Sequence, residues 1–212
     1  MMRKEHIRLM LRAVLGAVLC LVAGCASDPS SRGGVGHFHT VIVDAGHGGS
    51  DRGARAVSGQ HEKYLALDTA DRLARELRSR GFRVIETRRN DTFIPLGYRT
   101  ELSNRTSDAI FVSVHYNWAR RSRPHGIEIY YSNPRSRPLA ANILQQTLRA
   151  YPTSNRGVKR NNYYVLRNNR RPAVLCELGF VSNPQDNRYL QNAATRQRLA
   201  ERIADGIVAS RR

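Results

Sequence analysis

The sequence predicts a single α/β domain in which a mostly parallel, twisted sheet is flanked by helices on both faces. Two observations predict this fold class. Short apolar runs of the kind that form buried strands recur along the chain. Segments whose apolar residues recur every three or four positions lie between them. Such alternation is typical of a sheet whose strands are joined by right-handed helical crossovers.

Five apolar runs are predicted strands, and three periodic segments are predicted helices. The strands are residues 40–44, 83–87, 109–115, 126–131 and 173–177. The helices are residues 62–80, 138–150 and 195–208. Gly81 is expected to end the first helix, because glycine adopts the left-handed conformation found after helices. Thr195 is the predicted N-cap of the last helix.

Residues 1–24 are predicted to be a lipoprotein signal peptide. Basic residues precede an apolar run, residues 13–24, that is shorter than the roughly 20 residues needed to cross a bilayer. The run ends in LVAGC, which resembles the bacterial lipobox and implies cleavage before Cys25 and lipidation of its thiol. The next residue is alanine rather than aspartate, which resembles lipoproteins sorted to an outer membrane. We therefore expect a lipid-anchored protein on the periplasmic face of that membrane.

Residues 25–36 are expected to be the lipidated cysteine and a flexible tether, because serine, glycine, aspartate and proline dominate the segment. Cys20 leaves with the signal peptide and Cys25 is acylated, so Cys176 stands alone in the mature chain and no intramolecular disulfide is expected. The formal net charge of +18 favours a polyanionic partner. Because the basic residues are scattered and aromatic residues are few, we expect anionic cell-wall or membrane surfaces and no nucleic acid.

Four polar residues stand where predicted strands or helices begin or end: His47, Glu62, His115 and Glu177. In parallel sheets, ligands bind outside the carboxyl ends of the strands, so these side chains are expected at one edge. Two imidazoles and a carboxylate form a common zinc set with one open position. A further carboxylate, for which Glu177 is the candidate, can move the protons of amide hydrolysis. His61 is an alternative to Glu62, because imidazole is the commoner zinc ligand.

Several segments together carry a family resemblance. They are "VIVDAGHGG", "HEKYLALDTADRLARELRSRGFRVIETR", "IFVSVHYNW", "GIEIYY", "NRGVKRNNYYVLR" and "PAVLCELGFVSN". In this order, over about residues 40–207, they resemble the type 3 catalytic domain of the zinc-dependent N-acetylmuramoyl-L-alanine amidases. The resemblance implies that residues 37–212 are a catalytic domain of this type.

The same resemblance assigns roles to the four polar residues. It implies that His47, Glu62 and His115 hold Zn²⁺ and that Glu177 is catalytic, and it favours Glu62 over His61. The implied reaction is hydrolysis of the amide between N-acetylmuramic acid and L-alanine in peptidoglycan, which serves cell-wall remodelling, including daughter-cell separation. A zinc peptidase acting on stem peptides and a non-catalytic peptidoglycan-binding lipoprotein are the alternatives. The second alternative predicts a lost ligand or base, yet all four residues are present.

Two further residues are candidates for substrate binding. Asn117 follows a predicted strand and can orient substrate or a water molecule, although asparagine at such a position is also a common turn former. Arg88 can pair with a stem-peptide carboxylate, or form a structural bridge to Asp44 or Glu86.

Two residues close in sequence to the candidate site residues, Glu128 and Cys176, are predicted to lie outside the site. Alternation along the predicted strand places Glu128 on a solvated face. Cys176 faces away from Glu177, since neighbours on a strand point in opposite directions, and is predicted to lie in the core.

The segment between His115 and Glu177 bears on regulation. Some members of the family carry a helical insertion there, which covers the zinc until a partner relieves it. Here the segment is filled by a predicted strand, a helix and the "NRGVKRNNYYVL" stretch, with little room for such an insertion. We therefore expect no obligatory activator. We also expect the protein to be a monomer.

Overall fold

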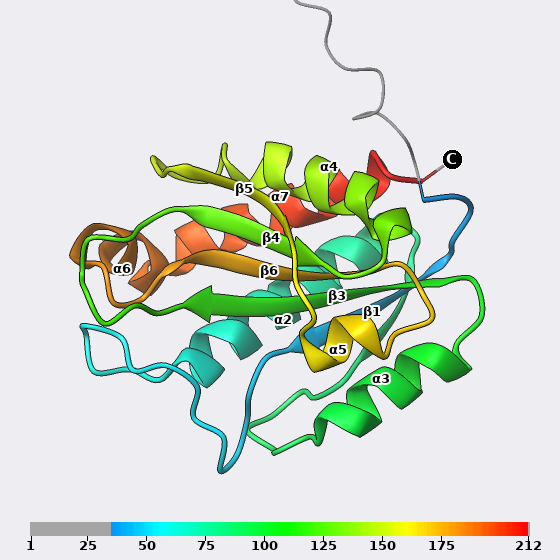
Figure 1. Ribbon diagram of the computed structural model, residues 1–212, viewed down its shortest axis with the longest axis horizontal. Helices are drawn as coiled ribbons and strands as arrows, with labels where there is room; N and C mark the ends of the chain where they lie inside the picture. Colours follow the sequence, from blue (N-terminus) through cyan, green and yellow to red (C-terminus); the bar gives the residue numbers. More distant parts are fainter. Residues whose placement is uncertain (1–34, 212) are drawn as a thin grey trace, which may run out of the picture. The chain divides into compact units, whose positions relative to one another are not determined.

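Six strands form one sheet in residues 35–211, the part of the chain that the computed structural model describes (Figure 1). The strands are β1 (Thr40–Ala45), β2 (Arg83–Glu86), β3 (Ala109–Asn117), β4 (Ile127–Tyr131), β5 (Asn155–Arg160) and β6 (Ala173–Phe180). Their order is β2-β1-β3-β6-β4-β5. Every neighbouring pair is parallel except β4 with β6. The predicted signal peptide, Cys25 and most of the tether lie outside the described residues.

Helices cover both faces of the sheet, as predicted (Figure 1). One layer comprises α2 (Glu62–Ser79), α4 (Arg137–Thr147) and α7 (Ala193–Val208). In this layer α7 packs on both α2 and α4. The helices α3 (Leu96–Arg105) and α5 (Tyr164–Arg167) contact β3 and β6, respectively. The remaining helical elements are the 3-10 turn η2 (Pro134–Ser136) and α6 (Pro184–Gln191). No helix among the described residues combines the length and apolarity needed to cross a membrane.

The alternation of side chains along the strands divides the core into two clusters. Val41 and Val43 of β1 belong to the larger cluster, which lies under α2, α4 and α7. Ile42, between them, belongs to the smaller cluster with Phe111 and Val165. The strands are therefore apolar on both faces, which explains why they appear in the sequence as continuous apolar runs.

The predicted elements are present with small shifts in their bounds, and Gly81 follows α2 with a φ of +82°. The predicted N-cap of the last helix is wrong. The cap is Asn192, whose side chain accepts a hydrogen bond from the Ala194 backbone at 2.8 Å, whereas Thr195 lies buried inside α7. Asparagine and threonine both cap helices, and the apolar stripe alone does not show which one begins the turn.

The sheet brings three strand ends and one strand beginning to the same edge. Strands β1, β3 and β6 are parallel, so their carboxyl ends coincide. Because β4 is antiparallel to β6, the loop of residues 118–126 that leads from β3 into β4 also lies at this edge. This edge carries the candidate site.

Candidate metal centre

His47 lies just beyond β1 in a left-handed backbone conformation, with a φ of +59°. That conformation is uncommon for residues other than glycine and persists only where surrounding contacts hold it. Here the Arg99 guanidinium donates to the His47 carbonyl at 2.8 Å, and the Gly46 backbone donates to Val114 of β3 at 3.0 Å. These contacts turn the imidazole toward the sheet edge.

Glu62 is the first residue of α2 and is buried. Its Oε1 accepts a hydrogen bond from the Tyr116 backbone at 3.0 Å, and its Oε2 accepts one from the Ala54 backbone at 2.9 Å. A carboxylate in the first turn of a helix is also favoured by the helix dipole. Both oxygens are therefore fixed in orientation while their remaining lone pairs face the two histidines.

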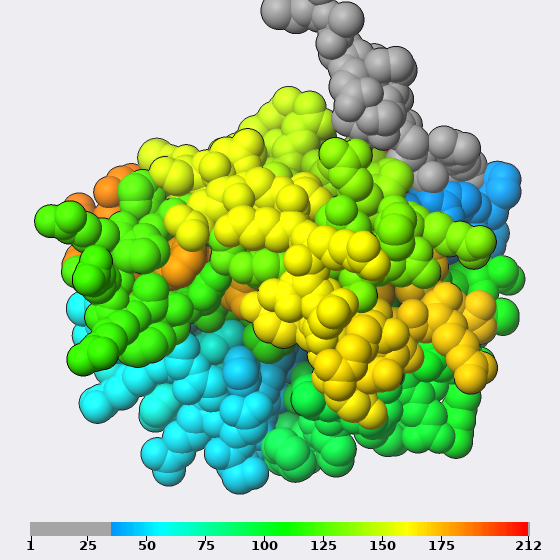
Figure 2. All heavy atoms as spheres, viewed as in Figure 1, coloured from blue at the N-terminus to red at the C-terminus, as the bar shows by residue number. Residues whose placement is uncertain are grey.

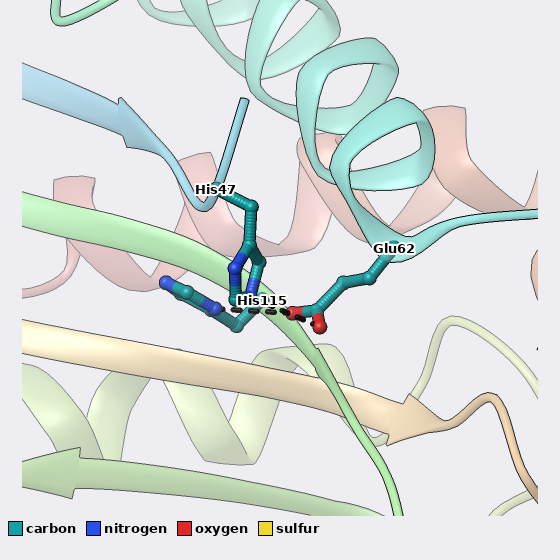
Figure 3. A group of neighbouring side chains, drawn as sticks. All are labelled: His47, Glu62 and His115. Carbon is teal, nitrogen blue, oxygen red and sulfur yellow. Dashed lines mark hydrogen bonds and ion pairs between the residues drawn. The ribbon is translucent and has the colours of Figure 1, made fainter. Parts of the chain in front are cut away.

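The two imidazoles converge on that carboxylate (Figure 3). His47 Nε2 lies 3.0 Å from Glu62 Oε2, and His115 Nδ1 lies 3.0 Å from Glu62 Oε1. Burial alone would raise the pKa of Glu62, but hydrogen bonds and charge from His115 and His47 outweigh burial and hold this pKa well below its usual range. Burial likewise would lower the pKa of His47, yet the contacts with Glu62 and Asp51 leave it above its ordinary value.

These three residues could hold a metal ion. One ligand atom from each of them lies within 4.8 Å of the other two. Nitrogen and oxygen ligands on one tetrahedral zinc ion are about 3.4 Å apart, so only small adjustments would accommodate the ion. His61, the alternative ligand, is not part of this group, and its Nδ1 is buried without a hydrogen-bond partner among the described residues.

Glu177 lies beside this group because the register of the sheet places it next to His115. It pairs with His115 across β3 and β6, so both side chains leave the same face. The expectation that Glu177 closes its strand is wrong, since β6 continues to Phe180. Glu177 Oε2 is buried without a hydrogen-bond partner among the described residues. Burial first, and then the negative charges of Glu62 and Glu128, raise the pKa of Glu177 well above its usual range.

A family model described as N-acetylmuramoyl-L-alanine amidase matches residues 41–209 and so includes all four of these side chains. The chain belongs to this amidase family. It is 37% identical over 182 residues to the putative N-acetylmuramoyl-L-alanine amidase YrvJ of Bacillus subtilis, a match covering 85% of this chain and 35% of YrvJ. It is 36% identical to the probable cell wall amidase LytH of Staphylococcus aureus, covering 79% of this chain and 57% of LytH. The chain thus spans less than two thirds of these relatives.

Solved amidase structures share the fold. The catalytic domain of CwlV from Bacillus (Paenibacillus) polymyxa superposes with a TM-score of 0.78 at 33% identity, covering 81% of this chain and 97% of that domain. AmiC2 of Nostoc punctiforme gives 0.77 at 34% identity, covering 80% and 94%. The CwlD amidase of Clostridioides difficile, solved in complex with the GerS lipoprotein, gives 0.76 at 30% identity, covering 80% and 96%. The catalytic-domain fold predicted from the sequence is confirmed.

Two glycines of the amidase domain make room for the cluster. A Cβ atom on Gly46 would lie 2.4 Å from His115 Cε1, and one on Gly53 would lie 2.7 Å from Glu62 Oε2. Gly53 also has a φ of +63°. At Gly46 glycine is therefore required for the close approach of an imidazole.

Asp51 is a residue of the site that the sequence analysis missed. Both of its carboxylate oxygens lie 2.9 Å from His47 Nδ1, on the side of the ring away from Glu62. Carboxylates in this position orient metal-binding histidines and select their tautomer. The available signal was the spacing of four residues within one glycine-rich loop.

Glu128 is buried, so its predicted place on a solvated face is wrong. It is the register partner of Glu177 on β4 and shares its face. Its carboxylate accepts hydrogen bonds from Asn117 Nδ2 at 2.6 Å and from the Tyr130 hydroxyl at 2.7 Å, and it pairs with Arg156 and Lys159. Alternation along the strand correctly placed Glu128 on the face opposite Ile127 and Ile129. That face borders the candidate site rather than bulk solvent. The hydrogen bond to Glu128 thereby fixes the orientation of the Asn117 side chain.

Arg88 has a structural place in this amidase domain instead of the substrate-binding place considered for it. Its buried guanidinium donates to the carbonyls of Ala45, Gly46, Lys63 and Asn90. It does not pair with Asp44 or Glu86, and it does not line the cavity that opens over His47, Glu62 and His115. Arg88 therefore holds the loop that carries His47 to α2 through main-chain carbonyls.

A cavity of about 510 Å³ opens over the cluster and Glu177. Its wall includes five large apolar side chains that are exposed at the surface: Phe93, Leu96, Trp118, Tyr163 and Tyr164. Figure 2 shows the hollow between the cyan segment that leads to α2 and the yellow segment around α5. The site therefore combines buried charged groups with an apolar rim, the usual composition of a ligand pocket.

Proposed function

We propose that the chain hydrolyses the amide bond between N-acetylmuramic acid and L-alanine in peptidoglycan, with zinc held by His47, Glu62 and His115. One observation carries the proposal. Three convergent ligand atoms and Glu177 lie together in an open cavity of a chain that belongs to the amidase family. When bound, zinc supplies a Lewis acid for the amide carbonyl and makes water a better nucleophile at neutral pH.

The residues of the chain prepare the site for that ion. Glu62 contributes a negative charge and is held by two backbone amides, so its oxygens do not need to reorganise. Asp51 holds the His47 ring through Nδ1 and leaves Nε2 facing the centre. Glu62 belongs to α2 and His115 to β3, so a helix and a strand each hold one of these ligands in place.

Glu177 is placed to move protons. Its raised pKa makes it a competent base toward water and, once protonated, an acid toward the departing amine of L-alanine. Its Oε2 has no hydrogen-bond partner among the described residues, and Glu177 lines the cavity. Asn117 lines the same cavity, and we propose that it orients the substrate there.

Mass spectrometry of purified peptidoglycan tests the reaction. Digestion by the wild-type chain is expected to release peptides with a new L-alanine amine and to leave intact lactyl carboxylates on the glycan. Glu177→Ala is expected to abolish that release while zinc content is retained. Release of fragments cut within the stem peptide, with the lactyl amide intact on the glycan, would instead identify a peptidase.

We propose that the enzyme remodels the wall from the periplasmic face of the outer membrane, anchored by lipid on Cys25. The lipobox-like sequence supports this proposal. Metabolic labelling with a palmitate analogue is expected to mark the wild-type chain and not Cys25→Ser. A role in daughter-cell separation predicts chains of unseparated cells when the gene is deleted.

We propose that the monomer is active without an activator. The side chains of His47 and His115 remain 22% and 17% exposed toward the cavity, so no described element covers the candidate metal site. The CwlD amidase, which has a similar structure, has been solved in complex with the GerS lipoprotein. The proposal therefore concerns whether this chain needs a second protein for activity. Purified protein supplied only with zinc is expected to digest peptidoglycan, whereas activity seen only after addition of a second protein would contradict this proposal.

A further inference from the structure

The loop of residues 118–126 carries three arginines whose side chains make no ion pair or hydrogen bond within the described chain. Arg120, Arg121 and Arg123 are all exposed. Arg75 on α2 and Arg105 on α3, by contrast, are surface arginines with carboxylate partners. Like charges placed side by side repel one another, so this group contributes nothing evident to folding.

The loop is nevertheless held firmly. The Ala119 backbone donates to Ser182 Oγ at 3.0 Å, and Asn183 Nδ2 donates to the Ser122 carbonyl at 2.7 Å. At the far end, the Gly126 backbone donates to the buried Asp186 carboxylate at 2.8 Å. The backbone is therefore fixed while the three guanidinium groups project outward, an arrangement that reduces the entropy cost of binding.

The surface around the loop lacks acidic side chains. Three shallow hollows adjoin it, and no aspartate or glutamate of the described residues lines any of them. Arg55 lines one hollow beside Arg120, and Arg156 lines another beside Arg121 and Arg123. In Figure 2 the green loop projects at the left edge, next to the hollow of the cavity. We call Arg55, Arg120, Arg121 and Arg123 the arginine shelf.

The arginine shelf is continuous with the catalytic cavity. Trp118, which is 53% exposed, lines both the cavity and the hollow that contains Arg55 and Arg120. A polymer with one unit in the cavity must therefore cross Trp118 to reach the shelf. A ligand confined to the shelf, such as a membrane headgroup, would have no reason to be aligned with the cavity.

We infer that the arginine shelf binds the carboxylates of stem peptides that neighbour the one being cleaved on the same peptidoglycan strand. The inference rests on the proposed function, because that function places peptidoglycan in the cavity. Each stem with a free C-terminus carries a carboxylate, and guanidinium groups bind carboxylates through paired hydrogen bonds. The shelf would thus favour polymeric peptidoglycan over short fragments.

Binding to insoluble sacculi tests the inference separately from catalysis. The measurement uses the full chain with Glu177→Ala, so that the sacculi are not digested. Changing Arg120, Arg121 and Arg123 together to glutamine is expected to weaken binding by about tenfold, the combined effect of three exposed ion pairs. The matched control changes Arg83, Arg135 and Arg137, three exposed arginines remote from the loop, to glutamine. Its binding to sacculi is expected to stay within about twofold of that of the parent.

Three comparisons decide the outcome. Sacculi whose carboxylates have been amidated are expected to bind the parent as weakly as untreated sacculi bind the shelf variant. In the active chain, the shelf variant is expected to lower the ratio of sacculus cleavage to cleavage of a single muramoyl-peptide by about tenfold. Equal losses of sacculus binding in both triple variants would overturn the inference. It would also be overturned if the shelf variant lost binding to anionic phospholipid vesicles but kept its binding to sacculi. Absence of cleavage by the wild-type chain would refute the proposed function without affecting the binding result.

Discussion

Arg99 and Asp44 form an ion pair buried beneath the loop that carries His47. Arg99 Nη1 lies 2.6 Å from Asp44 Oδ1, and the two side chains are only 3% and 1% exposed. Arg99 also donates to the carbonyls of Ala45 and His47, while Thr87 and Ser113 donate to Asp44. The pair therefore ties α3 to the end of β1 and supports the backbone conformation of the candidate metal loop.

Arg99→Met is expected to lower the free energy of unfolding by about 3–5 kcal/mol, because it leaves the Asp44 carboxylate buried without a counter-charge. Urea denaturation at pH 7 measures the change. The matched control is Arg105→Met, which removes the exposed pair with Glu101 on the same helix and is expected to cost less than about 1 kcal/mol. Similar small losses in both variants would show that the buried pair is not important for stability.

The contribution of Asp44 is expected to depend on pH. Burial alone would raise the pKa of Asp44, but Arg99 and the hydrogen bonds from Ser113 and Thr87 outweigh it and leave this pKa below its usual value. A carboxylate with a lowered folded-state pKa stabilises the fold above its unfolded pKa of about 3.9, and this stabilisation is lost as the pH falls through the folded value. The difference in unfolding free energy between wild type and Asp44→Asn should therefore be largest near neutral pH and shrink below about pH 4. A difference that does not change with pH would contradict the assignment.

Glu62→Ala is expected to abolish stoichiometric zinc binding, whereas His61→Ala should retain it. Glu62 contacts both imidazoles, while His61 stands outside the cluster. Zinc content after dialysis, measured by atomic emission, distinguishes the two variants. The reverse pattern would make His61 the ligand.

Asp51→Asn is expected to reduce zinc affinity by about 10- to 100-fold, the usual loss when a group that orients a metal-binding histidine is changed. Competition with a chromogenic chelator measures the affinity. Asp71→Asn serves as the control, because Arg75, on the exposed side of α2, is the one ion-pair partner of Asp71 among the described residues. An unchanged affinity in Asp51→Asn would mean that the His47 ring is held by its other contacts.

Gly46→Ala is expected to displace His115 and to lower zinc affinity by about tenfold or more, since metal sites tolerate only small shifts of their ligands. Gly97→Ala is the matched control. A Cβ on Gly97 meets nothing closer than the Tyr164 hydroxyl at 3.8 Å, and alanine in α3 should stabilise the helix by up to about 1 kcal/mol. The same chelator competition compares the two variants, and equal affinities would show that the His115 ring accommodates the added methyl group.

The apolar strands and long helices were predictable from the sequence because burial leaves a clear pattern. The edge strand β5 was not predicted. Its sequence, NRGVKR, contains one aliphatic residue, and its place is set by parallel pairing with β4. The helix α3 was missed as well, because it buries Arg99, Thr100 and Ser103 in place of an apolar stripe. Tertiary contacts, rather than local periodicity, determine both elements.

The candidate site was predictable only in part. His47, Glu62, His115 and Glu177 could be named because they stand near strand and helix ends within recognisable segments. Asp51 and Glu128 could not be assigned their contacts, since these depend on a turn geometry and on a cross-strand register that the sequence does not state. The choice of Glu62 over His61 likewise came from family resemblance.

Cys176, the one cysteine among the described residues, occupies the core as predicted, on the face of β6 opposite Glu177. Burial, and then the charge of Glu177, raises the pKa of its thiol, so the reactive thiolate is disfavoured while the sheet is intact. A thiol-specific reagent can reach the sulfur only when the sheet opens. In a chain lacking Cys20 and Cys25, the rate of alkylation at this single position would therefore report opening events directly beneath the Glu177 carboxylate.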